Sequence, residues 1–102
     1  MKHTATKADL EASAALAAQH LKLLANEQRL IVLCRLSEGE MSVGDLADYV
    51  GLNQSALSQH LAKLRAEGIV TTRRAGQTIF YRLANPSITR IIDLLCELYR
   101  GD

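Results

Sequence analysis

The chain has 102 residues, of which 48% are hydrophobic, enough to bury one core and to favour a single domain spanning residues 1–102. A single proline, no tryptophan and many Ala, Leu, Glu and Arg residues favour a mainly helical fold over a sandwich or barrel. The Ala-rich run 12–18 lacks the charge layout of a signal peptide, and no segment has the length of a membrane span. We therefore expect a cytoplasmic protein with free thiols and no membrane partner.

The formal charge of +1 hides an uneven distribution. Residues 53–82 contain five basic residues and one acid, which gives this segment +4 and leaves −3 for the rest of the chain. A basic face on an acidic body is typical of a protein that contacts phosphates with one surface only. The low net charge therefore does not exclude nucleic acid as a partner.

Capping residues and glycines predict two helices in the first part of the chain. The first covers about residues 9–24, where small Ala side chains allow a partner helix to approach closely. Asn26 can cap the second, residues 27–38, because its side chain can accept a hydrogen bond from a free backbone amide. Gly39 is expected to end it.

Similar signals predict the remaining elements. Ser42 can cap a short third helix that continues to about residue 50, and a fourth is expected over 53–68. Two β-branched and aromatic runs, IVTTRR and TIFYRL, are joined by AGQ and predict a hairpin of strands 69–74 and 78–83. Asn85 and Pro86 then begin a last helix, 86–99, as a cap and a first-turn proline.

The third and fourth helices have helix-turn-helix spacing. Ala47 is small at the point where two helices must cross closely, and Gly51 follows four residues later and allows the turn. Apolar residues at helical spacing form the expected core stripe: Val43, Leu46, Val50, Leu57, Leu61 and Leu64. The fourth helix would therefore be the recognition helix.

The opposite face of the fourth helix carries small and polar side chains, which would let it enter a major groove. Ser and Gln side chains can bind base edges, and Lys and Arg can bind phosphates. The candidate DNA-binding residues of this helix are Gln54, Ser55, Ser58, Gln59, His60, Lys63 and Arg65. The alternative is an ordinary solvated helix face. His60, beside the leucine stripe, is the member expected to be structural or to contact the DNA backbone.

The predicted hairpin supplies further candidates around Gly76, namely Arg73, Arg74, Gln77 and Thr78, which could reach an adjacent groove or the DNA backbone. A helix-turn-helix followed by such a hairpin is a winged helix. The expected fold is thus mainly α, a winged helix-turn-helix of five helices and a two-stranded wing.

The segments QSALSQHLAKLRAEGIVTTRRAGQTIFYRL and LLANEQRLIVLCRLSEGEMSVGDLADYVGL resemble the ArsR/SmtB family of small bacterial repressors. The resemblance extends over about residues 16–99. It implies a homodimer built on the first and last helices, which binds an imperfect palindrome in double-stranded operator DNA and releases it when an inducer is sensed. Two-fold symmetry would place the recognition helices about 34 Å apart. Ile91 and Leu98 on the last helix would be poorly buried in a monomer, as the resemblance requires.

Metal-sensing members of the family carry motifs that this sequence lacks. Thiolate-type sensors have ELCVCDL in the third helix, whereas this chain has EMSVGDL, with Ser42 and Gly44 in place of the thiolates. Zinc sensors carry an Asp-x-His and a further His or Glu pair on the last helix, whereas this last helix has no histidine. A high-affinity metal site needs about four converging ligands. We therefore expect no metal and no other cofactor.

The cysteines Cys34 and Cys96 lie on apolar stripes, at helical spacing from Leu30 and from Ile92 respectively. By composition and spacing alone, both can be small core residues, as most buried free cysteines are. However, a cysteine on the second helix together with one on the last helix, without a metal motif, resembles the SqrR/BigR-type persulfide-responsive repressors and the related HlyU-type regulators. The resemblance implies that the dithiol senses a persulfide or polysulfide and that bridging of the thiols releases DNA.

The distance between the cysteines would decide the kind of bridge. A plain disulfide can close if their Cα atoms lie within about 7 Å, whereas a larger gap would need a longer sulfur chain. Alternative functions are a repressor that responds to general oxidants or to a soft metal, and a protein-binding winged helix with structural cysteines. An enzyme is least expected, because no nucleophile with an evident base and no phosphate loop is present.

Overall fold

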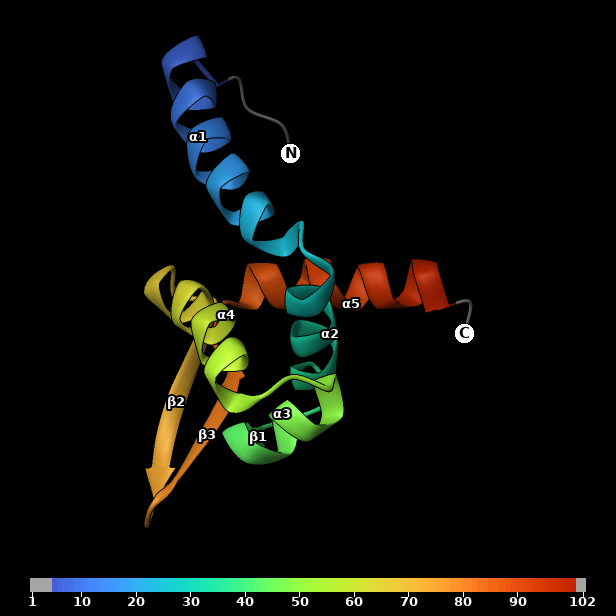
Figure 1. Ribbon diagram of the computed structural model, residues 1–102. Coiled ribbons are helices and arrows are strands. Elements are labelled where there is room, and N and C mark those ends of the chain that lie inside the picture. The colour runs from blue at the N-terminus through green and yellow to red at the C-terminus, as the bar shows by residue number, and fades with distance from the viewer. Residues whose placement is uncertain (1–4, 101–102) are drawn as a thin grey trace.

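The computed structural model describes residues 5–100, which form five helices and three strands (Figure 1). In chain order the elements are α1 (Lys7–Leu24), α2 (Glu27–Leu36), β1 (Met41–Ser42), α3 (Val43–Val50), α4 (Gln54–Ala66), β2 (Val70–Ala75), β3 (Thr78–Leu83) and α5 (Pro86–Arg100). The expected domain, residues 1–102, extends past the described residues at both ends. Among the described residues, no helix combines the length and hydropathy needed to cross a membrane.

Helix ends differ from the predictions by about one turn or less. α1 begins at Lys7 rather than at residue 9, because Thr6 forms a capping box with Asp9. α2 ends at Leu36 rather than at residue 38, since the backbone tightens into i to i−3 hydrogen bonds over the next residues. α4 covers Gln54–Ala66, so it is shorter than the expected 53–68 at both ends. β2 covers Val70–Ala75 rather than 69–74, and α5 continues to Arg100 rather than ending at residue 99.

The sheet has three strands rather than the two predicted. β1 pairs antiparallel with β3 through Met41 opposite Tyr81 and Ser42 opposite Phe80, so the strand order is β1-β3-β2. A strand of two residues is too short to leave an alternating pattern in the sequence, and its partner is distant in the chain. The predicted winged-helix architecture with a two-stranded hairpin wing is confirmed, and β1 adds a short third strand to the sheet that the sequence analysis missed.

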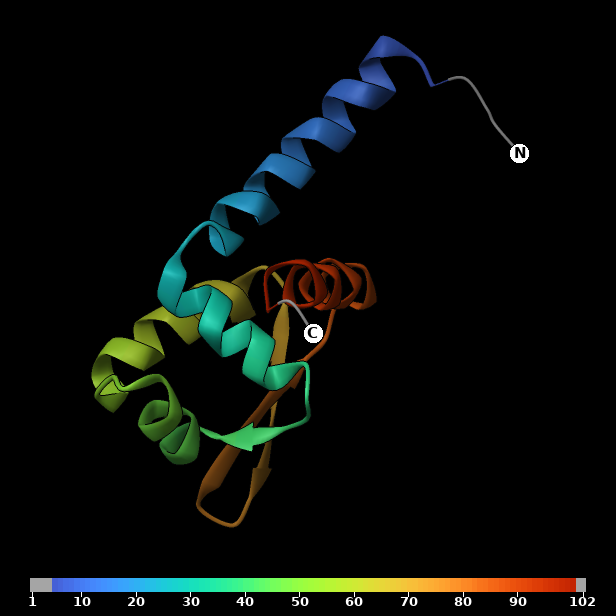
Figure 2. The ribbon, with the colours of Figure 1, turned by 90° about the vertical axis from the view of Figure 1, so that its right-hand side faces the viewer.

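The hairpin projects from the body of the molecule as a wing (Figure 2). β2 and β3 pair in register from Val70 opposite Leu83 at the base to Ala75 opposite Thr78 at the tip. Gly76 has a φ of 63° at the turn, a left-handed conformation that glycine adopts without steric cost. Burial falls along β2 from the base to the tip, so the outer part of the wing is exposed.

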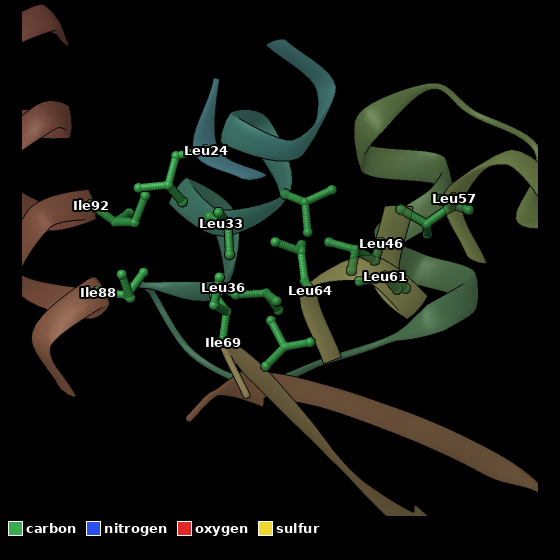
Figure 3. Close-up of a cluster of buried hydrophobic side chains, with 13 residues drawn as sticks. Leu24, Leu33, Leu36, Leu46, Leu57, Leu61, Leu64, Ile69, Ile88 and Ile92 are labelled. Atoms are coloured by element: carbon green, nitrogen blue, oxygen red, sulfur yellow. The ribbon is translucent and has the colours of Figure 1, made fainter. Parts of the chain in front are cut away.

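The core lies where α2, α4 and the start of α5 meet (Figure 3). α2 supplies Leu33 and Leu36, which lie between the α5 residues and the leucines of α4. The α4 stripe predicted from the sequence is fully buried, with Leu57, Leu61 and Leu64 at 0% exposure. This stripe fixes which face of α4 is turned to solvent.

α1 is the least packed element. It projects away from the body (Figures 1 and 2), and Leu24 is its only buried residue among those described. The radius of gyration is 15.3 Å, larger than the value of about 13 Å for a compact domain of this length. Leu16 on α1 and Leu98 on α5 are 54% and 61% exposed, so two helices present apolar side chains without a partner in the single chain.

Candidate nucleic-acid interface and thiol pair

Local capping and turn geometry set the orientation of α4. The Ser42 side chain accepts a hydrogen bond from the Asp45 amide at the start of α3, and the Asn53 side chain accepts one from Ala56 at the start of α4. Between the two helices, Gly51 has a φ of 83° and donates its amide to the Ala47 carbonyl. The turn predicted at Gly51 is therefore present and joins α3 to α4.

Six of the seven α4 candidates are exposed. They are Gln54, Ser55, Ser58, Gln59, Lys63 and Arg65. Lys63 and Arg65 lie in the last turn, where cations also interact favourably with the helix dipole. α4 therefore presents neutral hydrogen-bonding side chains along its length and positive charge towards its C-terminal end.

His60 differs from the other α4 candidates because it is half-buried against α2. Its Nδ1 lies 3.3 Å from Nη1 of Arg29. Burial lowers the pKa of His60, and the nearby positive charges of Arg29 and Lys63 lower it further. The geometry therefore supports the structural alternative already raised for this histidine.

Arg29 is a buried residue that the sequence analysis missed. It is 9% exposed, and its Nε donates to the Leu23 carbonyl at 2.6 Å, while Nη2 approaches the Lys22 carbonyl at 3.4 Å. These carbonyls belong to the last turn of α1, so one guanidinium joins α1, α2 and α4. No local pattern in the sequence marks this residue, because arginine is rarely buried in any context.

The two arginines of the wing, Arg73 and Arg74, have different hydrogen-bond partners. Arg73 donates to both carboxylate oxygens of Glu40 at 2.6 to 3.0 Å, and its guanidinium lies 4.5 Å from the centre of the Phe80 ring. The Arg73 hydrogen bonds lower the pKa of Glu40. Arg74 instead makes a single hydrogen bond to the Gly76 carbonyl at 3.1 Å. Arg74, with exposed Gln77 and Thr78, is thus more available at the wing tip than Arg73.

Cys34 on α2 and Cys96 on α5 lie against each other. Their Sγ atoms are 2.8 Å apart, both residues are half-buried, and both thiols are free. The prediction that both face helix-packing surfaces agrees with their position at the edge of the core. The separation leaves less than one ångström to the bonded length of about 2.05 Å, so a direct disulfide is within reach.

The surroundings of the pair are mainly apolar. Burial raises the pKa of Cys34 to about 12, with further contributions from the hydrogen bond and the charge of Cys96. Arg100 acts in the opposite direction on Cys34, and Asp93 adds to the rise. Cys34 therefore keeps its proton at neutral pH. Within residues 5–100, no three His, Cys, Asp or Glu side chains are grouped so that they could hold a metal ion.

Known proteins resemble this chain closely. The model of the arsR family of bacterial regulatory proteins matches residues 26–72. The transcriptional activator HlyU of Vibrio cholerae is 48% identical over 91 residues, which cover 89% of this chain and 84% of HlyU. The chain belongs to the arsR family. The family resemblance found in the sequence is thereby confirmed.

Solved structures agree with this arsR-family assignment. Reduced HlyU from V. cholerae superposes with a TM-score of 0.86 at 49% identity, over 88% of this chain and 95% of HlyU. The repressor BigR of Xylella fastidiosa gives 0.82 at 41% identity, over 93% of this chain and 97% of BigR.

A third structure is more distant in sequence. It is a fragment of Mb0332 from Mycobacterium bovis, described as a homodimeric winged helix-turn-helix DNA-binding domain, and it gives a TM-score of 0.79 at 31% identity over 96% of this chain and 89% of the fragment. The arsR-family chain is therefore a transcriptional regulator with a winged-helix fold and not an enzyme.

Proposed function

We propose that this arsR-family regulator is a repressor that binds operator DNA as a homodimer while Cys34 and Cys96 are reduced, and that it releases DNA when sulfur bridges them. The observation that carries the proposal is the 2.8 Å separation of the two Sγ atoms, from residues 62 positions apart in the chain. Two thiols in contact suit a two-electron switch, because one can attack a sulfur donor and the other can resolve the product.

The exposed face of α4 and the wing tip are the proposed DNA-binding surface. Gln59 and its serine neighbours can donate to and accept from base edges, and the Lys and Arg side chains can bind phosphates. Arg74, Gln77 and Thr78 are exposed at the wing. Arg73 would first have to exchange Glu40 for a phosphate, and His60 would act by holding α4 in place rather than by contacting DNA.

The exposed apolar side chains of α1 and α5 support a homodimer. A helix as exposed as α1 is a marginal structure unless its apolar side chains pack against something. The relative from M. bovis is described as homodimeric. We propose that residues 1–102 act as one domain that dimerises through α1 and α5, which would present two α4 helices to an imperfect palindrome.

The proposed reaction can begin at either thiol, because the two sulfurs lie 2.8 Å apart and titrate as a pair; the steps are the same from both, and Cys96 is taken as the first to react. The Cys96 thiolate attacks the outer sulfur of a persulfide R–S–S–H. The S–S bond of the donor breaks, the thiolate RS⁻ leaves and takes a proton from water, and Cys96 becomes a persulfide. Cys34 then attacks the Cys96 Sγ, hydrogen sulfide leaves with the Cys34 proton, and a disulfide forms.

A longer sulfur bridge can also form without any further oxidant. If a second donor molecule converts Cys34 to a persulfide, its outer sulfur can attack the Cys96 Sγ and release hydrogen sulfide, which leaves a trisulfide. Because the sulfurs already lie 2.8 Å apart, distance does not favour this bridge over a disulfide. The same distance supports a second candidate function, a response to general oxidants such as peroxide.

The two helices joined by the proposed bridge are connected to the dimer interface and to the wing of the proposed DNA complex. α5 would be a dimer helix, while α2 leads through Glu38 and Glu40 to the wing, where Glu40 binds Arg73. A bridge between α2 and α5 would therefore restrain the dimer helix and the wing together. Coupling of about 1–3 kcal/mol would weaken operator binding up to about 150-fold.

The test begins with an operator duplex selected from a random-sequence library by the reduced protein. Fluorescence anisotropy then measures its affinity before and after treatment with glutathione persulfide, with peroxide as a comparison and intact mass recorded on the same samples. We expect the bridged protein to bind at least tenfold more weakly. Cys34→Ser should accept sulfur at Cys96 without forming a bridge and should keep its DNA affinity.

Each contrary outcome has a distinct meaning. Failure to select any duplex would contradict DNA binding and favour a protein-binding winged helix. Unchanged affinity of a bridged protein would contradict the switch and leave both cysteines as packing residues. Equal loss of binding with peroxide and persulfide would replace sulfur sensing with a general oxidant response.

A further inference from the structure

Two pockets meet at the thiol pair. One, of about 370 Å³, is lined by Leu30, Cys34, Leu95, Cys96, Tyr99 and Arg100. The other, of about 390 Å³, shares Leu30, Cys34 and Arg100 with the first and adds Glu38 and Tyr49 to its wall. Cavities of this size bind small organic molecules. Arg100 lies in the wall of both, so its guanidinium is close to the thiols in either pocket.

Arg100 and Arg35 lie near the same carboxylate. Arg100 Nη2 lies 3.4 Å from Glu38 Oε2, and Arg35 Nη1 lies 3.8 Å from Glu38 Oε1, so two guanidiniums share one carboxylate. The Arg35 guanidinium also lies 5.7 Å from the centre of the Tyr49 ring, and its Nη1 is buried without a hydrogen-bond partner among the described residues. Glu27 is the other acid of the pocket wall. Arg100 makes one long contact among the described residues, so its guanidinium retains donors for an incoming anion.

The only ionic contact of Arg100 with a described residue is weak. Its single contact with Glu38 is long for a charge-assisted hydrogen bond, and the two side chains are 48% and 52% exposed. Such a pair contributes little stability and can exchange partners. Arg100 also follows Cys96 by one helical turn on α5, which places both groups on the same side of the helix.

We propose that Arg100 binds the carboxylate of an organic persulfide and so directs its outer sulfur to the thiol pair. The apolar walls from Leu30, Leu95 and Tyr99 would accept the carbon chain of the donor, and the guanidinium would select donors that carry a carboxylate. Arg100 is thus a positioning residue for the sulfur donor. The inference rests on the proposed sulfur-sensing function and adds a ligand class to it.

The test compares two donors that differ only in the carboxylate, N-acetylcysteine persulfide and N-acetylcysteine amide persulfide. The rate at which each adds sulfur to the reduced protein is followed by mass spectrometry. Wild type should react about tenfold faster with the carboxylate donor, as the loss of one charged hydrogen bond implies. Arg100→Gln should bring the ratio of the two rates close to one, whatever it does to both rates together.

Two further variants sharpen the result. Glu38→Gln should increase the preference for the carboxylate donor, because it frees Arg100. Arg90→Gln removes an exposed arginine of the same helix that is not in either pocket wall, and it should leave the ratio at the wild-type value. A ratio near one in wild type, or an unchanged ratio in Arg100→Gln, would overturn the proposal.

Failure of this proposal is separable from failure of the proposed function. If both donors bridge the thiols at equal rates and DNA is released, sulfur sensing stands and the role of Arg100 is wrong. If the carboxylate donor is preferred but the modified protein keeps its DNA affinity, the pocket assignment stands and the switch is wrong.

Discussion

The surface formed by α4 and the wing and the thiol pair between α2 and α5 are built in different ways. The exposed side chains of α4 come from consecutive turns of one helix and extend separately into solvent. The two thiols come from helices far apart in the chain and lie 2.8 Å from each other at the edge of the core. A substitution on the surface of α4 and the wing removes one side chain and leaves the others in place, whereas replacing either cysteine removes the thiol pair.

The arginines of the two regions also differ in whether they act singly or share a partner. Among residues 5–100, Arg74 makes one hydrogen bond, within its own turn, which leaves donors for a phosphate. Arg35 and Arg100 share Glu38, and Arg100 lies beside the thiols. Positive charge therefore has two separate uses in this molecule. Variants of each region can test whether the two act separately, and the thiols should give the largest effect.

Closing a disulfide between Cys34 and Cys96 should raise the free energy of unfolding by about 4 kcal/mol, because a loop of 62 residues is closed in the unfolded chain. Urea denaturation of the reduced and the oxidised protein measures this difference. Cys96→Ser treated with the same oxidant is the control and should unfold at the same urea concentration with and without oxidant. An oxidised protein no more stable than the reduced one would show that the bridge distorts the fold.

Gln59→Ala should weaken binding to the selected operator by about 2 kcal/mol, since a bidentate contact to a base edge is lost. Its free energy of unfolding should change by less than about 0.5 kcal/mol, because the side chain is exposed. Anisotropy titrations with operator and with unrelated duplex separate the effects. Equal weakening on both duplexes would mean that Gln59 contacts the DNA backbone.

The wing arginines should differ in their effect on the salt dependence of binding. Arg74→Gln should reduce the slope of log affinity against log salt by about 0.9, the value for one phosphate contact. Arg73→Gln should change it less, because Glu40 already holds that guanidinium. Glu40→Gln should free Arg73 and steepen the slope. Identical slopes for the two arginine variants would show that Arg73 leaves Glu40 in the complex.

The smallest effect concerns pH. The pKa of His60 is lowered in the folded protein, so between that pKa and the ordinary value of 6.5 the unfolded chain binds more protons. Stability from this group is therefore fully present above pH 6.5 and declines as pH falls through this window. His60→Gln should remove that part of the decline, which urea denaturation from pH 7.5 to 5 can detect. An unchanged pH profile would show that His60 already titrates normally.

Local patterns predicted much of the fold and of the α4 surface. The leucine stripe of α4 repeats within one helix and identified the buried face, and the turns at Gly51 and Gly76 follow from short-range glycine chemistry. These features depend on residues close in the chain, which is why hydrophobic periodicity and turn composition were sufficient.

Features that depend on distant residues were not predictable in the same way. β1 is defined by pairing with β3, the Glu40–Arg73 contact spans 33 positions, and the Arg29–His60 contact spans 31. The family resemblance selected Cys34 and Cys96, but only the packing of α2 on α5 gives their separation. Arg100 follows Cys96 by four residues in the chain, but its place in two pocket walls required the fold.

The Arg29 contacts have a consequence for the length of the operator. Because one guanidinium contacts both the end of α1 and His60 of α4, these two helices would turn together about the axis of the proposed dimer. The angle at which two α1 helices cross would then set the distance between the two α4 helices, and with it the number of base pairs between half-sites. Lengthening the linker of Ala25 and Asn26 would thus change which operators fit, without altering any residue that contacts DNA.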